Sequence, residues 1–313
     1  MSSYDVIVLG EPLVEIATLT EIEPDVPATI GVSGDALNAA AAAAATGAQV
    51  ALLALITDDE LGDMVASRVR ALGIDDALLR RTAGQQGMYL VHSDPDGQRQ
   101  FHYARSGSVG SRLAPDDLPL DVIAAAGAVL ASGITCALSD SARAAVVAAA
   151  RRSRAFVYDP NFRPRLTTAG RSAATLAELA PLAALVTPSA PAETGALLGT
   201  ANPVAAAARC RELGAAAAAV TCGSDGVLLA AGTHDGNVSR TWVPAVPAPA
   251  VIDQTGAGDV FAGTVTARLA LGDPLTDAVP LGAAAASLAV GGQGGTGRIA
   301  SLAEIRAHAG LTA

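Results

Sequence analysis

Seven residues toward the end of the chain, Asp253-Gln-Thr-Gly-Ala-Gly-Asp259, form the pattern best suited to chemistry. Gly256 and Gly258 allow the backbone to turn tightly and to approach a ligand closely. The apolar stretch that follows predicts a helix beginning near Gly258, whose free N–H groups and positive dipole end would face an anion. Asp259 would lie in the first turn of that helix, where a carboxylate could accept the proton of an attacking hydroxyl group. The alternative is an ordinary loop with an acidic helix cap.

A second Gly-rich turn, Ser33-Gly34-Asp35-Ala36-Leu37-Asn38, runs into an alanine-rich helix near the start of the chain. Taken alone, this segment is equally well explained as a turn with a helix cap.

The chain contains 20 lysine and arginine residues, and all of them are arginine. A P-loop lysine, the strand lysine of protein kinases and a Schiff-base lysine are therefore excluded. Any phosphate group that this protein handles must be held by backbone amides and arginine.

Composition indicates a folded enzyme with small-molecule partners. With 313 residues and 51% hydrophobic content the chain can bury a large core, and no apolar run approaches the roughly 20 residues of a membrane span. The net charge of −10 argues against binding to nucleic acid or to an anionic membrane. The start of the sequence lacks the basic and cleavage-site pattern of a signal peptide, so we expect a cytoplasmic protein. Three widely spaced cysteines fit neither a disulfide framework nor a zinc site.

Short β-rich runs alternate with helical stretches through most of the sequence, which predicts an α/β fold with a mostly parallel sheet and helices on both faces. The expected strands cover residues 6–10, 50–56, 128–133, 155–160, 184–189 and 217–223. The expected helices cover residues 38–46, 60–72, 140–152, 169–180 and 203–213, and the region 254–313 is helical after its first loop.

Two regions break this rhythm, because they contain strand-like runs without a helix between them. The runs at 13–19 and 28–32 form one pair, and those at 87–94 and 99–105 form another, joined across the turn sequence Asp94-Pro-Asp-Gly97. We expect a small sheet that stands off a single domain covering residues 1–313, with its strands inserted at about 12–34 and 86–106. Such a lid could cover a substrate.

The DxTGAGD pattern, followed by a Phe-Ala-Gly helix, resembles the C-terminal signature of the ribokinase-like, or PfkB, carbohydrate kinase family. The resemblance extends over essentially the whole chain and implies a three-layer sandwich with a β-sheet lid. It implies that the amides of Gly256, Ala257 and Gly258 form an anion hole and that Asp259 is the catalytic base. The Ser33–Asn38 segment corresponds to the family's first motif, although Ser33 stands where the family has glycine.

Within this family, a further set of residues resembles the 2-keto-3-deoxygluconate kinases. The resemblance lies in GDALN at 34–38, GMYLV at 87–91, FHYAR at 101–105 and DPNFRPRL at 159–166. It implies that the substrate is bound by Gly34, Asp35, Asn38, Tyr89, Tyr103, Arg105 and Arg163. Independently, Tyr103 and Arg105 are two apart on a predicted strand and so share a face, with His102 on the other. A guanidinium on that face could bind a substrate carboxylate.

The resemblance also implies ATP and Mg²⁺, and a monovalent cation is a further candidate. The nucleotide is expected against Asn161, Arg163, Thr221, Gly223, Ser224, Gly226, Thr255, Gly256 and Gly258. Glu193 is the candidate metal-linked residue, acting through water, although the asparagine of the family's Asn-x-x-Glu element is absent. A homo-oligomer formed through the lid is expected.

Three alternatives bear on the function. A kinase for a neutral sugar such as fructose or ribose, or for a nucleoside, would need Arg105 and Arg163 to be structural or to face the nucleotide. A non-catalytic sensor of sugar or nucleotide could use the same fold, but the intact Asp259 motif argues against it. A Rossmann dehydrogenase is disfavoured, because Gly10-Glu11-Pro12 follows the first strand in place of GxGxxG.

Overall fold

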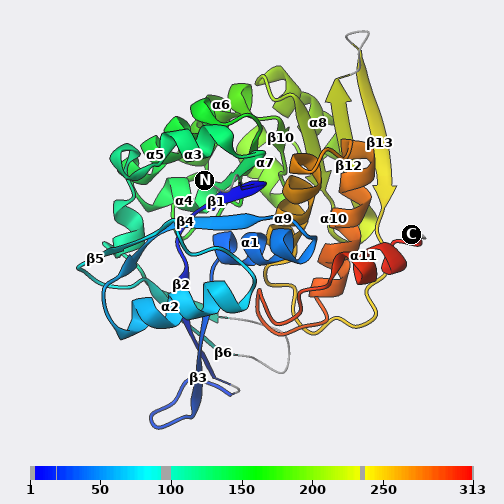
Figure 1. The fold of residues 1–313 in the computed structure, drawn as a ribbon. Coiled ribbons are helices and arrows are strands. Elements are labelled where there is room, and N and C mark those ends of the chain that lie inside the picture. Colours follow the sequence, from blue (N-terminus) through cyan, green and yellow to red (C-terminus); the bar gives the residue numbers. More distant parts are fainter. Residues whose placement is uncertain (1–3, 19, 93–99, 233–236, 312–313) are drawn as a thin grey trace.

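The main body is built on a nine-stranded sheet whose strands follow the order β13-β12-β11-β10-β9-β8-β1-β4-β5 (Figure 1). The computed structural model describes residues 4–18, 20–92, 100–232 and 237–311. The strands are β1 (Val6–Leu9), β4 (Val50–Thr57), β5 (Leu79–Thr82), β8 (Ala128–Ser132), β9 (Phe156–Asp159), β10 (Leu185–Val186), β11 (Ala217–Thr221), β12 (Gly226–Gly232) and β13 (Val238–Pro244). All neighbours pair in parallel except β11–β12 and β12–β13. The prediction of a mostly parallel sheet is confirmed.

Helices cover both faces of this sheet because its central strands are apolar on both sides. In β1, Val6 and Val8 face one layer and Ile7 and Leu9 the other, and all four are at most 1% exposed. The first layer contains α1 (Asp35–Ala45), α2 (Glu60–Ala71), α9 (Ala257–Ala270) and α10 (Leu275–Ala289), with α11 (Leu302–His308) packed on α10. The second contains α3 (Leu120–Ala125), α4 (Gly133–Leu138), α5 (Asp140–Arg152), α6 (Ala169–Leu179), α7 (Ala192–Leu198) and α8 (Pro203–Glu212). No helix in the described ranges has the length and apolarity needed to cross a bilayer.

The lid is a separate four-stranded sheet that projects from the main body (Figure 1). Its order is β3-β2-β6-β7, formed by β2 (Leu13–Thr18), β3 (Ala28–Ser33), β6 (Met88–His92) and β7 (Gln100–Ala104). The β2–β6 pair is parallel, and the two outer pairs are antiparallel. The small sheet expected from the sequence is confirmed, whereas the turn predicted at Asp94–Gly97 lies outside the described residues.

The structure contains elements that the sequence pattern did not reveal. β12 and β13 extend the sheet as an antiparallel hairpin, and the helix expected from Asn38 begins one turn earlier, at Asp35. Short segments such as β5, α3 and α7 also escaped the prediction. These segments of four to seven residues carry too few periodic positions to separate helix from strand.

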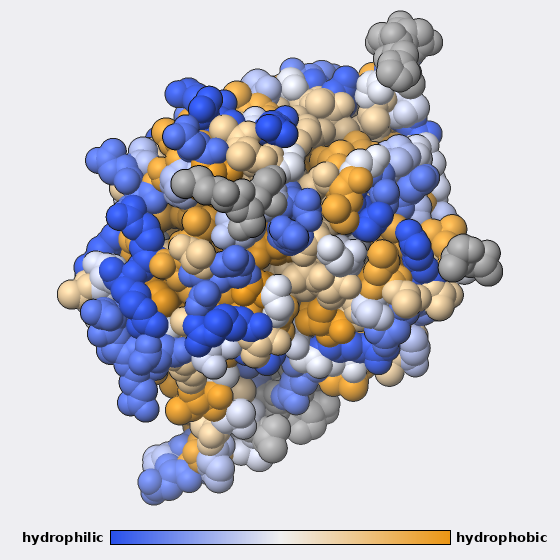
Figure 2. All heavy atoms as spheres, in the orientation of Figure 1, coloured by the Kyte–Doolittle hydropathy of each residue, from blue (hydrophilic) through white to orange (hydrophobic). Residues whose placement is uncertain are grey.

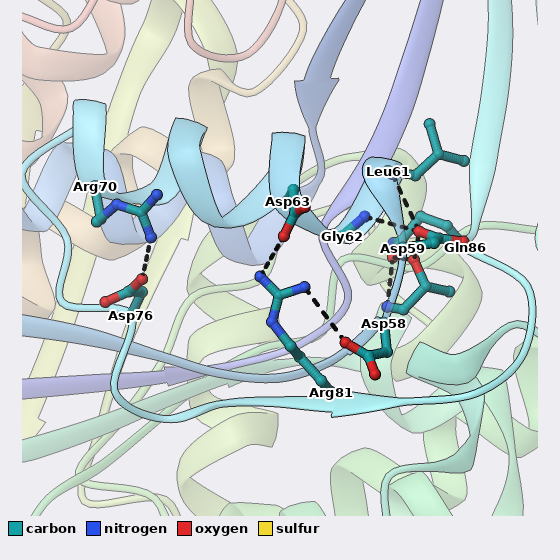
Figure 3. Close-up of polar contacts among 10 residues, drawn as sticks. Asp58, Asp59, Leu61, Gly62, Asp63, Arg70, Asp76, Arg81 and Gln86 are labelled. Atoms are coloured by element: carbon teal, nitrogen blue, oxygen red, sulfur yellow. Dashed lines mark hydrogen bonds and ion pairs between the residues drawn. The ribbon is translucent and has the colours of Figure 1, made fainter.

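The turn between β4 and α2 is fixed by polar contacts, several of which are drawn in Figure 3. Asp59 caps α2 by accepting from the amides of Leu61 and Gly62 at 3.0 and 3.1 Å, and the hydroxyl of Thr57 and these amides lower the pKa of Asp59. Nearby, Gln86 accepts from the Thr57 amide and donates to the Pro12 carbonyl at 2.8 Å. Gln86 therefore ties the start of β6 to the end of β4 and the start of β2.

Ion pairs connect α2 to the chain that follows it. Arg81 on β5 contacts Asp63 at 2.7 Å and Asp58 at 3.9 Å, and Arg70 contacts Asp76 at 2.5 Å (Figure 3). These side chains are largely exposed, so each pair contributes at most about 1 kcal/mol.

Helices α1 and α9 cross at backbone distance, and this contact places two motifs of the sequence side by side. A Cβ atom added to Gly263 of α9 would lie 2.1 Å from the carbonyl oxygen of Ala39 in α1. Only glycine fits at this position without moving a helix. The close approach brings Asn38 of α1 near the first turn of α9.

We predict that Gly263→Ala lowers the free energy of unfolding by about 1–3 kcal/mol, because the added methyl group must push the two helices apart. The matched control is Gly195→Ala in α7, where a Cβ would meet no atom within 4 Å. That variant should be unchanged or more stable by about 0.5–1 kcal/mol. Urea unfolding monitored by circular dichroism measures both. Equal stability of the two variants would contradict the close crossing.

Candidate active site

Asp259 lies in the first turn of α9, which begins directly after Gly256. Gly256 adopts φ +80°, a conformation that side chains disfavour, and a Cβ there would approach the Cα of Gly295 to 2.8 Å. This turn aims the start of α9 toward the cavity described below. Asp259 is only 8% exposed, so its carboxylate must be satisfied within the protein.

Two asparagine amides hold the carboxylate of Asp259. Nδ2 of Asn38 donates to Oδ2 and Nδ2 of Asn161 donates to Oδ1, each at 2.9 Å. Asn161 lies in the loop after β9 with φ +41°, and its backbone N–H donates to Oδ1 of Asp159 at 3.2 Å. Asparagine tolerates this left-handed conformation better than most residues, which lets its side chain turn toward α9.

The environment of Asp259 raises its pKa to about 6. Burial is the main cause, and the carboxylate of Asp35 adds to it, whereas the amide of Asn38, the charge of Arg163 and the amide of Asn161 oppose it. Asp35 itself accepts a hydrogen bond from the hydroxyl of Ser132. Near neutral pH, Asp259 is therefore mostly ionised, yet it is a stronger base than an exposed aspartate.

A second pair of carboxylates lies behind Asp259. Burial raises the pKa of Asp159, with further contributions from Glu193 and Asp259, and burial also raises the pKa of Glu193. Glu193 accepts backbone N–H groups with both oxygens, from Phe162 at 2.5 Å and Ser189 at 2.7 Å. It joins the loops after β9 and β10, so any link to a metal would use the remaining lone pairs through water.

Asp259 opens into a cavity of about 560 Å³ between the lid and the carboxyl ends of the central strands. Its wall brings together most of the predicted site residues: Gly34, Asp35, Asn38, Tyr89, Tyr103, Arg105, Asn161, Arg163, Thr255, Gly256, Gly258 and Asp259. His102 is not part of the wall, as expected from strand alternation. The wall is completed by residues to which the sequence analysis assigned no individual binding role: Leu13, Ser33, Phe101, Ile134, Pro164, Arg165, Leu166 and Gln254.

Other predicted residues lie outside this wall. Ala257, which was expected to contribute to an anion hole, is the first residue of α9 and does not line the cavity, and neither does Glu193. Thr221, Gly223, Ser224 and Gly226 follow the carboxyl end of β11 and lead into β12. Their expected contact with a nucleotide stays a prediction.

Three aromatic rings of the lid form the apolar side of the cavity. The ring centroid of Tyr89 lies 5.7 Å from that of Phe101 and 5.9 Å from that of Tyr103, and Phe101 and Tyr103 stack at 6.1 Å. Burial raises the pKa of Tyr89, whose hydroxyl donates to Glu15. Rings packed in this way present a rigid surface to a ligand.

The three arginines of the wall differ in what they contact. Arg105 is buried against Glu11, whereas Arg163 and Arg165 are exposed. Arg163 donates only to the carbonyl of Phe162, at 3.2 Å, and Arg165 donates to the carbonyl of Phe101 at 2.8 Å, which connects the loop after β9 to the lid. Within the described residues neither Arg163 nor Arg165 forms an ion pair, so both leave positive charge on the wall, whereas Arg105 is paired with Glu11.

Comparison with known proteins identifies relatives over nearly the full length. Residues 10–300 match the profile described as pfkB family carbohydrate kinase. A 2-dehydro-3-deoxygluconokinase of Thermoproteus tenax is 33% identical over 296 residues, covering 92% of this chain and 89% of that protein. A 2-dehydro-3-deoxygalactonokinase of Haloferax volcanii is 27% identical over 262 residues, covering 82% and 80%. The fold matches a ribokinase II candidate from E. coli in complex with ATP and Mg²⁺, with a TM-score of 0.85, 22% identity and full coverage of both chains.

We predict that Asn161→Gly raises the pKa of Asp259 above its value of about 6, because it removes a hydrogen bond to the charged form while permitting the same backbone conformation. A pH titration followed by NMR of ¹³C-labelled aspartate measures this shift, and Asp259→Asn identifies the signal. Asn202→Ala, which removes only the cap of α8, serves as the control. A pKa that stays constant or falls would refute this account of the site.

Proposed function

This chain belongs to the pfkB family of carbohydrate kinases, and we propose that it transfers the γ-phosphoryl group of ATP to a terminal hydroxyl group of a 2-keto-3-deoxy sugar acid, with 2-keto-3-deoxygluconate as the first candidate. The observation that supports this most is that one cavity contains both a base and positive charge. The buried base Asp259 and the exposed guanidinium of Arg163 both line its wall. A short acid with a reacting hydroxyl group needs both kinds of group.

In the proposed reaction, Asp259 accepts the proton of the substrate hydroxyl group as its oxygen attacks the γ-phosphorus. Asn38 and Asn161 each donate to one carboxylate oxygen, so they orient Asp259 while lone pairs remain for the proton. The pKa of about 6 keeps Asp259 ionised at neutral pH and strengthens it as a base.

The start of α9 is suited to the phosphate groups of ATP. Gly256, Ala257 and Gly258 provide the turn and the first helical amides, and a Cβ on Gly258 would meet no protein atom within 4 Å, so its surroundings are open to a ligand. In the pfkB family reaction ATP supplies the phosphoryl group, and Mg²⁺ offsets its negative charge.

Few protein ligands for Mg²⁺ are needed, because this ion usually keeps several waters and binds substrate phosphates. Among the described residues no cluster of three or more histidine, cysteine or acidic side chains is arranged to hold a metal. Glu193, acting through water, is the proposed link. A monovalent cation remains a further proposal.

The proposed homo-oligomer would form through the lid. β3 is an edge strand of the lid sheet, and Ile30 on it is 62% exposed. Figure 2 shows apolar side chains among polar ones on the projecting lid. Pairing of such an edge with a second copy would cover both its backbone groups and its apolar side chains.

A second candidate function, a kinase for a neutral sugar, is favoured by one contact. The ion pair of Arg105 with Glu11 cancels one of the positive charges that the acid would meet. A screen of ATP consumption over sugar acids, neutral sugars and nucleosides separates the two candidates. Preference of the enzyme for fructose, ribose or a nucleoside over every acid tested would overturn the acid assignment and leave the kinase family intact.

We predict that Asp259→Asn lowers kcat by about 10²–10⁴-fold with little change in KM, because the shape remains but the proton acceptor is lost. In the wild type, kcat should fall as pH decreases through about 6, since the raised pKa protonates the base there rather than near pH 4. The residual activity of Asp259→Asn should lack this limb. Turnover within a few-fold of wild type would exclude Asp259 as the base.

We predict that Arg163→Ala raises KM for the sugar acid by about tenfold to a hundredfold, because a charge-assisted hydrogen bond is lost. The change for a weakly accepted neutral sugar should be much smaller. KM for ATP is measured in parallel, since Arg163 is also expected near the nucleotide. Arg209→Ala on α8 is the control, because this exposed arginine forms an ion pair with Glu212 at the surface, away from the cavity wall. Equal losses on acid and neutral substrates would contradict this role of Arg163.

A further inference from the structure

Glu11 is a buried carboxylate that the proposed reaction does not use. It lies two residues after the end of β1, separated from it by Gly10, and is 1% exposed. Nε of Arg105 donates to its Oε2 at 2.9 Å, and the hydroxyl of Ser108 donates to Oε1. Nη2 of Arg105 lies 2.6 Å from the same Oε2 as an ion pair, without the geometry of a hydrogen bond. Both carboxylate oxygens are thus engaged, and two of the three guanidinium nitrogens face the same acid.

The third nitrogen of Arg105 remains available to a ligand. Arg105 belongs to the cavity wall, and Nη1 has no hydrogen-bond partner within the described part of the chain. The ring of Tyr103 lies 5.8 Å from the guanidinium carbon and restrains it from another side. The guanidinium is therefore held between Glu11 and Tyr103 with one N–H edge left over.

The space around Glu11 admits this carboxylate only because two neighbours lack side chains. A Cβ on Gly87 would lie 2.4 Å from Oε1 of Glu11, and one on Gly110 would lie 2.4 Å from its Cγ. The position of the carboxylate is consequently fixed by backbone on two sides. Because the side chain of Glu11 is packed so closely, few other rotamers are open to it, and it cannot easily reach another hydrogen-bond partner.

The pair also lies where the lid joins the main body. β2 begins just after Glu11, β6 begins just after Gly87, and β7 ends at the residue before Arg105. Any movement of the lid strands relative to β1 would therefore change the position of Arg105 relative to Glu11.

We propose that Glu11 is a positioning residue that holds Nε and Nη2 of Arg105 so that Nη1 points into the cavity and binds the acid group of the substrate. This inference rests on the proposed function. In this arrangement one N–H group of Arg105 sets the orientation of the acid group, and Arg163 and Arg165 contribute the positive charge that is not paired with Glu11. Arg105 therefore does not bind the acid with the two-nitrogen fork that its residue type would allow.

The test compares three variants. Glu11→Asp keeps the charge but shortens the reach, so it should retract Nη1 and raise KM for the sugar acid by about tenfold, while kcat and KM for ATP change less than about threefold. Ser108→Ala loosens Glu11 without changing charge and should raise KM by a smaller factor. Gln86→Ala breaks contacts at the base of the lid without touching the ion pair, and its KM for the acid should stay near that of wild type.

A double-variant cycle shows whether Glu11 acts through Arg105. Arg105→Met and the double variant Glu11→Gln with Arg105→Met should have the same raised KM, because no guanidinium remains to be positioned. If KM rises further in the double variant, Glu11 has a separate role and the inference fails. Should Arg105→Met not fold because Glu11 is left unpaired, the double variant, which buries no charge, is compared with Glu11→Asp instead; it must then have a KM at least as high.

The outcome separates this inference from the proposed function. A wild-type enzyme that prefers sugar acids, with KM unchanged in Glu11→Asp, would overturn the positioning role alone. A wild-type enzyme that prefers a neutral sugar would overturn the acid substrate, and the inferred contact to an acid group with it. An equal rise of KM in Gln86→Ala and Glu11→Asp would assign the effect to the attachment of the lid and so reject the role of Arg105.

Discussion

The burial of an ionisable carboxylate at the start of a helix is the constraint on which the centre of this molecule depends. Asp259 can remain charged there only because Asn38 and Asn161 satisfy its oxygens, and those two residues come from α1 and from the loop after β9. Both must arrive within hydrogen-bond distance of α9. The backbone contact between α1 and α9 at Gly263, the turn at Gly256 and the left-handed conformation of Asn161 all serve this approach.

The cavity combines proton chemistry with charge recognition. Burial raises the pKa of Asp259 and Asp159, and neighbouring carboxylates add to it, Asp35 for Asp259 and Glu193 for Asp159. Arg105, Arg163 and Arg165 add positive charge to the same wall, the last two from the loop after β9. The charges on the wall therefore favour one orientation of a charged substrate that enters between the lid and the sheet, in addition to the constraint from the shape of the cavity.

Local chemistry made much of this site predictable from sequence. A Gly-rich turn before an apolar helix specifies its own geometry, so Gly256, Gly258 and Asp259 were placed correctly together, and alternating runs predicted the central strands. The partner of a buried charge is set by tertiary packing, which spacing does not reveal. Asn38 was expected to bind the substrate and does line the cavity, but its Nδ2 donates a hydrogen bond to Asp259, which is 221 positions away in the sequence. Glu11 was considered only as part of a strand end that lacks a nucleotide-binding loop, although an acid two residues after an apolar strand was a usable signal.

The ion pair of Glu11 with Arg105 also bears on how proteins of this kind could diverge. Loss of either member alone leaves a charge enclosed among backbone atoms, which is strongly destabilising, whereas replacement of both by apolar side chains can be nearly neutral. Evolution toward another substrate at this corner therefore faces a barrier of sign epistasis: the first step is harmful and the second restores fitness. A lineage that has acquired the pair is expected to keep or exchange it as a unit, and directed evolution by single substitutions would rarely escape from it.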